Sequence, residues 1–385
     1  MNIGSLLPRH ARYRSNHLAF VIGEERLNFC ELNIRVNRLA NALLAAGILK
    51  GQKMATVLSN CEELMLLYWA AAKTGIVIVP GSPLLQASGL TTLLRDSDTE
   101  IVFADASFAE TLQSIKKNLP AIQNMHWIFI GDCKRHNSGL SVSGFQSYAD
   151  FISGAEETEP PDTKIVDGDT YNIMYSSGTT GNPKGVVYSH RSTYMHTITT
   201  MTTDGLGVCE SDVILPVVPM FHVNSWGLQH AAVAAGATLV NPGPKLQPEP
   251  IAELMESERV TIAAGVPTIW MGVLEELDGR DVSSLRAIPC GGSAVPKSLS
   301  EGYREKIGLP ILQAWGMTET SPLAAIAHVK SADADLDEEA KSDIRSSIGT
   351  IVPTVEFRIC EPDSIEELPW DGESSGELQV RGSFI

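Results

Sequence analysis

The sequence is poor in cysteine, in basic residues and in long apolar runs. Its six cysteines lie far apart in 385 residues, with no CxxC pair and no histidine at finger spacing, so a disulfide framework and a zinc finger are excluded and reduced thiols are expected. Lys and Arg total 29 against 46 Asp and Glu, which gives a net charge of −17. Because the basic residues form no cluster, nucleic acid is not expected as a partner.

The sequence contains no stretch typical of a signal peptide or a membrane span. The first 17 residues lack the apolar core of a signal peptide. The most apolar window, 66–85, is interrupted by Lys73, Gly75, Pro80 and Pro83, so it is not a transmembrane segment. We therefore expect a cytoplasmic protein.

Short apolar runs alternate with helical periodicity through most of the chain. With 43% hydrophobic and 19% charged residues, the chain can bury a sizeable core. Segment 31–47, for example, places its apolar residues on one helical face and stops at Gly47. This alternation predicts an α/β fold of two packed subdomains with mixed, largely parallel sheets. The expected strands are 54–58, 76–79, 101–104, 127–130, 171–176, 186–190, 213–217, 238–240, 261–265, 285–290 and 310–314.

A polar, acidic segment divides the chain. Residues 153–170 carry two prolines and are interpreted as a connector, so we expect one α/β subdomain over 1–165 and a second over 166–330. Period-two alternation in 354–359 and 377–381 predicts a small antiparallel β subdomain over 331–385.

Residues 175–185 read YSSGTTGNPKG, a loop between two expected strands. Glycines let a backbone approach phosphates, hydroxyls donate to their oxygens, and Lys184 offsets charge. It is not a Walker loop, because Pro183 precedes Lys184 and Gly185 follows it where Ser or Thr should stand. Composition alone fits a phosphate loop and a simple turn about equally well.

A second stretch, QAWGMTETSP at 313–322, combines an aromatic ring, a glycine, a hydroxyl and a carboxylate. Trp315 could stack on a base, and Glu319 could hold a divalent ion, because magnesium prefers oxygen ligands. Taken alone, a Thr-Glu pair in a turn is more often a helix cap.

Together, the two stretches resemble the phosphate loop and the adenine motif of the adenylate-forming superfamily. GGSAVP at 291–296 and GELQVRG at 376–382 are similar to two further motifs of that family, in the same order. The resemblance covers essentially the whole chain. The segment VPMFHVNSWG at 218–227 resembles the gate of medium- and long-chain fatty-acyl-CoA synthetases.

The resemblance implies a role for individual residues. The implied catalytic residues are Lys184, His222, Thr318 and Glu319. The implied nucleotide contacts are Ser176, Ser177, Gly178, Thr179, Thr180, Gly181, Lys184, Gly291, Gly292, Ser293, Ala314, Trp315, Gly316, Met317 and Thr318. The implied acyl-side residues are His222, Val223, Trp226 and Gly265, and the implied magnesium ligands are Ser176 and Glu319.

Two of these positions depart from the family pattern, and two have an ordinary alternative. Ser176 stands where close relatives often have threonine, and Trp315 stands where tyrosine is usual, so the phenol's hydrogen bond is lost. Without the flanking motifs, Trp226 and His222 would be interpreted as a buried aromatic and a core histidine.

The implied function is that of an ATP-dependent acyl-CoA synthetase. A carboxylate attacks the α-phosphorus of ATP to give acyl-AMP, and the thiol of coenzyme A then displaces AMP, with Mg2+ assisting. The partners would be a fatty acid and CoA, and a homodimer is common among gated relatives. An acyl-AMP ligase for another acid or acceptor, and a catalytically silent nucleotide-binding paralogue, remain as alternatives.

Family members continue beyond a GELQVRG-like strand into a ribose-binding motif, a hinge and a mobile C-terminal domain with a catalytic lysine. None of these features follows in this sequence. We therefore expect the chain to be the large N-terminal portion of such a ligase, with little acyl-adenylate formation of its own.

Overall fold

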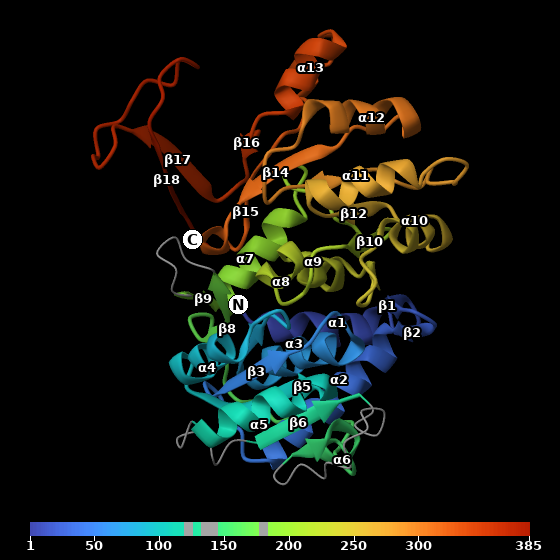
Figure 1. Cartoon of the computed structure of the whole chain (residues 1–385), viewed down its shortest axis with the longest axis vertical. Helices are drawn as coiled ribbons and strands as arrows, with labels where there is room; N and C mark the ends of the chain where they lie inside the picture. The colour runs from blue at the N-terminus through green and yellow to red at the C-terminus, as the bar shows by residue number, and fades with distance from the viewer. Residues whose placement is uncertain (119–125, 132–144, 177–183) are drawn as a thin grey trace.

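Two large, mostly parallel sheets form the body of the molecule (Figure 1). The computed structural model describes residues 1–118, 126–131, 145–176 and 184–385. A seven-stranded sheet has the order β7-β6-β5-β3-β4-β8-β9, and only its β8–β9 pair is antiparallel among the described residues. A five-stranded sheet has the order β12-β10-β11-β1-β2, with only β1–β2 antiparallel in the same part of the chain.

The strands of the two large sheets are β1 (Leu18–Ile22), β2 (Glu25–Asn28), β3 (Lys53–Val57), β4 (Val77–Gly81), β5 (Thr99–Asp105), β6 (His126–Ile130), β7 (Gln146–Ser147), β8 (Thr170–Ser176), β9 (Lys184–Ser189), β10 (Val213–Pro216), β11 (Thr238–Asn241) and β12 (Ile262–Ala264). The smaller sheets contain β13 (Pro289–Cys290), β14 (Leu312–Gly316), β15 (Leu323–Ile326), β16 (Thr350–Ile351), β17 (Val355–Cys360) and β18 (Glu377–Gly382).

The α-helices are α1 (Leu6–Tyr13), α2 (Phe29–Ala45), α3 (Glu62–Thr74), α4 (Ala87–Asp96), α5 (Ala109–Asn118), α6 (Tyr148–Phe151), α7 (His190–Thr200), α8 (Val223–Trp226), α9 (Leu228–Ala235), α10 (Pro248–Ser257), α11 (Pro267–Glu275), α12 (Lys297–Ile307) and α13 (Glu338–Arg345).

Neighbouring residues of one strand face two different cores, which gives the body its layers. In β3, Met54 belongs to a central core and Ala55 to an outer one, and in β1 the same holds for Phe20 and Val21. Helices α1, α2, α3 and α9 fill the central core between the two sheets, whereas α4 and α5 cover one outer face and α10, α11 and α12 the other. Helix α3 is buried continuously over 64–74, as expected for a helix that is apolar on every side.

The predicted fold class is confirmed. The sheets are mixed and largely parallel, and β17 pairs with β18 in an antiparallel hairpin that projects from the upper left of Figure 1. The sequence boundary near residue 165 does not separate two sheets, however. Strand β1 pairs with β11, and β4 pairs with β8, so each large sheet takes strands from both sides of that boundary.

The acidic connector 153–170 is fixed to the body by a row of asparagines on α2. Asn33, Asn37 and Asn41 lie at every fourth position and therefore share one helical face. Their amides donate to Glu159 Oε1 at 2.6 Å, to the Glu157 carbonyl at 3.0 Å, and to the carbonyls of residues 156 and 158. The connector is thus an ordered strap over α2.

A buried lysine on α3 completes this attachment. The side chain of Lys73 is only 3% exposed, and its Nζ donates to Asn33, to Asn37 and, at 2.8 Å, to Glu159 Oε2. Burial lowers the pKa of Lys73 to about 8, although the Glu159 carboxylate opposes that shift. The ammonium therefore depends on this one carboxylate for its counter-charge.

We expect Glu159→Gln to destabilise the fold by about 2 kcal/mol at pH 7, because it leaves a buried ammonium without a counter-charge. The effect is smaller than for a fully buried pair, because water screens the half-exposed Glu159 carboxylate. The folded pKa of Lys73 lies below its unfolded value, so the ammonium is lost in the folded state as the pH rises through about 8. The destabilisation should therefore shrink at pH 9.5. Urea unfolding at both pH values measures it.

Glu157→Gln is the matched control, because its 3.6 Å pair with Arg38 is exposed on both sides. It should change the free energy of unfolding by less than about 1 kcal/mol at either pH. Equal effects of the two substitutions would contradict the role given to Lys73.

None of the helices in the described part of the chain is both long and apolar enough to cross a membrane. The cysteines in that part, Cys30, Cys61, Cys209, Cys290 and Cys360, are all free thiols.

Candidate active site

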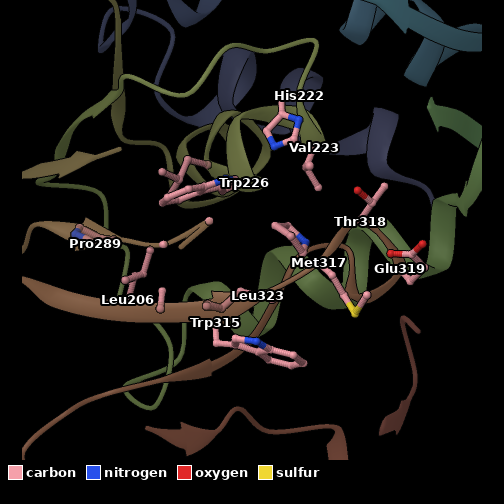
Figure 2. Close-up of a pocket in the computed structure, with 16 residues that line it drawn as sticks. Leu206, His222, Val223, Trp226, Pro289, Trp315, Met317, Thr318, Glu319 and Leu323 are labelled. Atoms are coloured by element: carbon pink, nitrogen blue, oxygen red, sulfur yellow. The ribbon is translucent and has the colours of Figure 1, made fainter. Parts of the chain in front are cut away.

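A cavity of about 260 Å³ lies between α8, the loop after β13, and the β14–β15 hairpin. Its lining brings together most of the residues implied by the sequence motifs: His222, Val223, Trp226, Gly291, Gly292, Ala314, Trp315, Gly316, Met317, Thr318 and Glu319. Figure 2 shows Thr318 and Glu319 at one end and Leu206 and Pro289 at the other. The cavity therefore has a polar end and an apolar end.

The polar end is built on the sharp turn that follows β14. Gly316 pairs with Leu323 of β15, and a methyl group at Gly316 would overlap the carbonyl oxygen of Pro322. The short 3-10 helix η4 (Thr318–Thr320) is closed by the Met317 amide, which donates to the buried Thr320 hydroxyl at 2.9 Å. This packing fixes where Thr318 and Glu319 point.

Tyr188 of β9 connects this turn to the strand that leaves the phosphate loop. Its hydroxyl donates to the Thr318 carbonyl at 2.5 Å. Burial, with a smaller contribution from the Glu319 charge, raises the pKa of Tyr188 well above its usual range, so the hydroxyl remains a donor. Strand β9 thereby links the phosphate loop to the adenine motif that contains Thr318.

Trp315 forms part of the cavity wall from β14. Its ring lies edge-to-face against Phe357 of β17, with the ring centroids 5.5 Å apart. The first strand of the projecting hairpin thus supports the indole from behind. A ring held in this way is suited to contact a flat heteroaromatic group.

The gate segment takes an unusual backbone conformation. Val223, Asn224, Ser225 and Trp226 have φ values of 47°, 55°, 51° and 57°, and Gly227 follows at 76°, so the segment labelled α8 is a left-handed turn. Each non-glycine residue in this conformation costs about 1 kcal/mol or more. Such strain is concentrated at functional sites, and here it aims Trp226 and Val223 at the cavity.

Buried hydrogen bonds hold the gate in this conformation. The Ser225 hydroxyl donates to the Val218 carbonyl at 2.9 Å, and the amide of Asn172 on β8 donates to Asn224 Oδ1 at 3.2 Å. His222 stands directly before the turn and lines the cavity. Burial lowers the pKa of His222, so its imidazole is neutral near pH 7 and can donate without adding charge.

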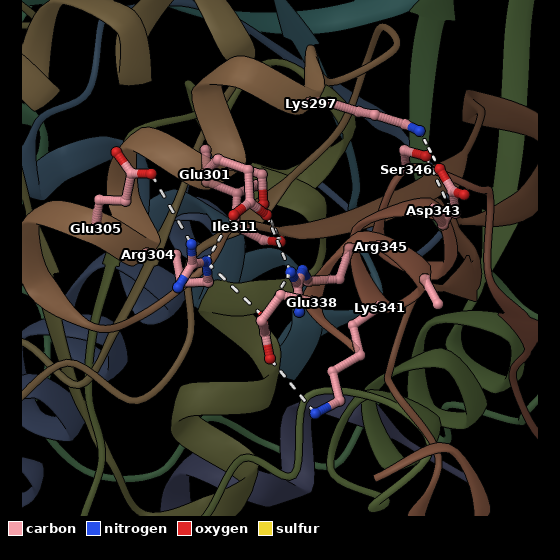
Figure 3. Close-up of polar contacts among 12 residues, drawn as sticks. Lys297, Glu301, Arg304, Glu305, Ile311, Glu338, Lys341, Asp343, Arg345 and Ser346 are labelled. Atoms are coloured by element: carbon pink, nitrogen blue, oxygen red, sulfur yellow. Dashed lines mark hydrogen bonds and ion pairs between the residues drawn. The ribbon is translucent and has the colours of Figure 1, made fainter. Parts of the chain in front are cut away.

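Gln313 and an ion pair between α12 and α13 join the elements around β14. The Gln313 side chain accepts from the Val295 amide at 2.9 Å and donates to the Ser347 carbonyl at 2.7 Å, so it joins β14, the GGSAVP loop and the end of α13. Figure 3 shows the neighbouring pairs, in which Arg345 contacts Glu301 at 3.0 Å and Glu338 at 3.3 Å.

The phosphate loop is only partly described. Ser177, Gly178, Thr179, Thr180 and Gly181 lie outside the described residues. The residues that flank them, Ser176 at the end of β8 and Lys184 at the start of β9, are a cross-strand pair. Neither belongs to the cavity lining that the structure describes.

Two other predicted residues also lie outside the lining. Gly265 is buried at the end of β12, where a methyl group would come 3.1 Å from the Trp270 ring, and Ser293 is exposed beyond the glycine pair. The roles given to both residues stay predictions. Conversely, sequence reasoning assigned no role to five lining residues, of which only Leu206 lies well away from the recognised motifs; the five are Leu206, Leu228, Pro289, Pro322 and Leu323.

Magnesium could bind here only with oxygens supplied by a ligand. Among the residues that the structure describes, no group of three or more His, Cys, Asp or Glu side chains is arranged to hold a metal ion. Glu319 supplies one exposed carboxylate at the cavity. A single carboxylate fits a magnesium ion that takes its other ligands from phosphates and water.

The two sheets and the cavity between gate and adenine motif define the large domain of an adenylate-forming enzyme. The inhibitor-bound N-terminal domain of FACL13 from Mycobacterium tuberculosis superposes with a TM-score of 0.82 at 25% identity, over 100% of this chain and 89% of that one. The fold and the order of the motifs therefore agree with each other.

The family model described as AMP-binding enzyme matches residues 7–385, and the chain belongs to this family. It is 33% identical over 390 residues to 3-methylmercaptopropionyl-CoA ligase of Ruegeria pomeroyi and 34% identical over 390 residues to medium-chain-fatty-acid–CoA ligase of Ectopseudomonas oleovorans. Both matches cover 100% of this chain, which spans 71% and 70% of those relatives. The resemblance inferred from the motifs is confirmed, and these relatives are acid–thiol ligases.

Proposed function

We propose that this chain binds ATP and a medium- or long-chain carboxylic acid as part of an acyl-CoA synthetase that forms acyl-AMP and then transfers the acyl group to CoA. The observation that carries the proposal is that one cavity has Thr318 and Glu319 at its polar end and the apolar side chains of Leu206 and Pro289 at its other end. The CoA ligase relatives support the choice of acceptor.

The polar end suits an attack by a carboxylate on the α-phosphorus. The nucleophile is already an anion, so no general base is needed, and the barrier comes from charge repulsion and from charge moving to the leaving pyrophosphate. In the proposed arrangement the Thr318 hydroxyl donates to the α-phosphate, and the neutral His222 donates to the reacting carboxylate. A magnesium ion held partly by Glu319 would offset the polyphosphate charge.

The remaining motif residues would hold the rest of the nucleotide. We assign the adenine to the space beside Trp315, Gly291 and Gly292, where a methyl group at Gly291 would come 2.6 Å from the Ala314 carbonyl oxygen. Ser176, Lys184 and the loop between them would contact the β- and γ-phosphates. Trp226 would separate the nucleotide from the acyl group until both are bound.

Calorimetry with an alkanoyl-sulfamoyl adenosine, a stable mimic of acyl-AMP, tests the proposal directly. We expect the chain to bind this mimic. Adenosine, which carries no acyl group, should bind at least about tenfold more weakly, because the apolar end then stays empty. Failure to bind both the acyl-AMP mimic and Mg-ATP would overturn the proposal. Binding of only aromatic acyl-AMP mimics would replace the fatty acid by an aromatic one.

A substitution separates the magnesium role of Glu319 from a purely structural one. We expect Glu319→Gln to weaken Mg-ATP binding about tenfold or more, because a charged ligand to the ion is lost. The same variant should bind the sulfamoyl mimic nearly as well as the wild type, because that molecule has no polyphosphate and needs no magnesium. Calorimetry with each ligand makes the comparison.

Glu339→Gln, an exposed carboxylate on α13, is the control and should leave both affinities unchanged. Equal weakening of both ligands by Glu319→Gln would indicate that Glu319 only shapes the turn.

A further inference from the structure

The apolar end of the cavity has a uniform chemistry. In Figure 2 the end opposite Thr318 and Glu319 is walled by Leu206 and Pro289, with Trp226 beside them, and the lining also includes Leu228 and Leu323. The ionisable side chains in the described lining, His222 and Glu319, belong to the gate and to the polar end. No ionisable side chain of the described lining stands at this end, which favours an alkyl chain over one with a second charge.

Leu206 reaches this end from an unexpected direction. It lies in the turn between α7 and β10, outside the recognised motifs, and it is 7% exposed. In Figure 2 it lies near Pro289, away from Thr318 and Glu319. An alkyl chain that grows from the polar end would meet Leu206 at the opposite end.

The backbone that carries Leu206 is held by an ion pair between the half-buried Arg286 and the buried Asp212. Arg286 donates from Nη1 to the Leu206 carbonyl at 3.1 Å and from Nη2 to the Gly207 carbonyl at 3.0 Å. Asp212, which is 2% exposed, holds the same guanidinium through two bonds of 2.8 and 2.7 Å. Two parallel charge-assisted bonds of this kind fix an arginine strongly in orientation.

Two further contacts hold the same turn. The Leu206 amide donates to the Thr200 carbonyl at 2.9 Å, at the end of α7. His328 contacts the Gly205 carbonyl at 2.7 Å from the segment after β15. The turn is therefore attached on both sides of Leu206, and a bound chain cannot push it away without breaking these bonds.

From these contacts we propose that Leu206 is the wall that limits the length of the acyl chain. This inference rests on the proposed function. The Leu206 side chain blocks a longer acyl chain, because hydrogen bonds hold the turn that carries it in place. The length limit is therefore set by the turn after α7 rather than by the gate.

The test is an affinity profile across saturated alkanoyl-sulfamoyl adenosines from butanoyl to tetradecanoyl. Leu206→Ala removes three side-chain carbons, so we expect the optimum to move to chains roughly three carbon atoms longer. An analogue two carbons longer than the wild-type optimum should gain about tenfold or more in affinity. Leu206→Phe fills the space and should move the optimum to shorter chains.

Leu299→Ala is the matched control, because Leu299 is 5% exposed on α12 and lies outside the described cavity lining. It should preserve the wild-type profile. If both Leu206 variants bind the butanoyl analogue and keep the wild-type optimum, Leu206 is not the wall, although the proposed function stands. If the wild type binds none of the analogues, the proposed function itself fails.

Discussion

Gly316→Ala is expected to reduce binding of an acyl-AMP mimic by about a hundredfold or more, because small misplacements of a binding group cost that much. A β-carbon at this position would overlap the carbonyl of Pro322, a backbone group directly before the paired strand β15 that cannot rotate away. Relief of the overlap must separate β14 from β15 and so displace Thr318 and Glu319. The strain should also lower the free energy of unfolding by about 1–3 kcal/mol.

Calorimetry and urea unfolding measure these two effects on the same protein. Gly168→Ala is the control, since a methyl group there would meet nothing within 4 Å and the backbone does not require glycine. The control should bind and unfold like the wild type. Full binding by Gly316→Ala would show that the β14–β15 turn does not position the ligand.

Acidification from pH 7 to pH 5 is expected to remove about 6 kcal/mol of stability, or about 2 kcal/mol for each of three buried histidines. Burial lowers the pKa of His190 to about 4 and those of His196 and His230 to about 3. These folded-state values lie below the unfolded value of about 6.5, so the unfolded chain binds more protons below pH 6.5. Stability is therefore lost as the pH falls through 6.5 towards 3.

The neutral form of His196 is part of the structure. Its Nε2 accepts from the Leu323 amide at 3.1 Å. Protonation of His196 would remove the acceptor that holds the start of β15 beside the cavity. We therefore expect acidification to disturb the start of β15 beside the cavity before the whole chain unfolds.

Urea unfolding at pH 7, 6 and 5 tests this expectation. His190→Leu should reduce the loss between pH 7 and pH 5 by about 2 kcal/mol, because it removes one of the three groups. His126→Gln is the control, because its exposed ring stays in water in the folded protein. Identical pH dependence for the wild type and His190→Leu would contradict the assignment.

Local patterns predicted the elements well, but they could not predict how the strands pair. The expected strands at 54–58 and 101–104 correspond to β3 and β5, because hydrophobic alternation is a property of neighbouring residues. The pairing of β1 with β11 depends on residues far apart in the chain, and no periodicity encodes it. The asparagine row on α2 was visible at every fourth position, yet its partner in the connector was not.

At the site, too, local motifs could be predicted, whereas contacts between distant residues could not. Contiguous motifs predicted the polar end, because Trp315, Thr318 and Glu319 come from one turn. Leu206 carries no chemistry that distinguishes it from other leucines, so only tertiary folding reveals its place. The left-handed gate was also hidden, since Val223 and Trp226 are among the residues least suited to positive φ, and surrounding contacts override that preference.

The pairing of β1 with β11 has a consequence for synthesis of the chain. Leu18 and Thr238, whose hydrogen bond joins these strands, are 220 residues apart. A ribosome adds ~5–20 residues per second, so β1 waits roughly 10 to 40 seconds for its neighbour. During that time Phe20 and Val21 must be shielded by transient contacts or by a chaperone. We therefore expect the yield of folded protein in cells to follow chaperone capacity and translation speed.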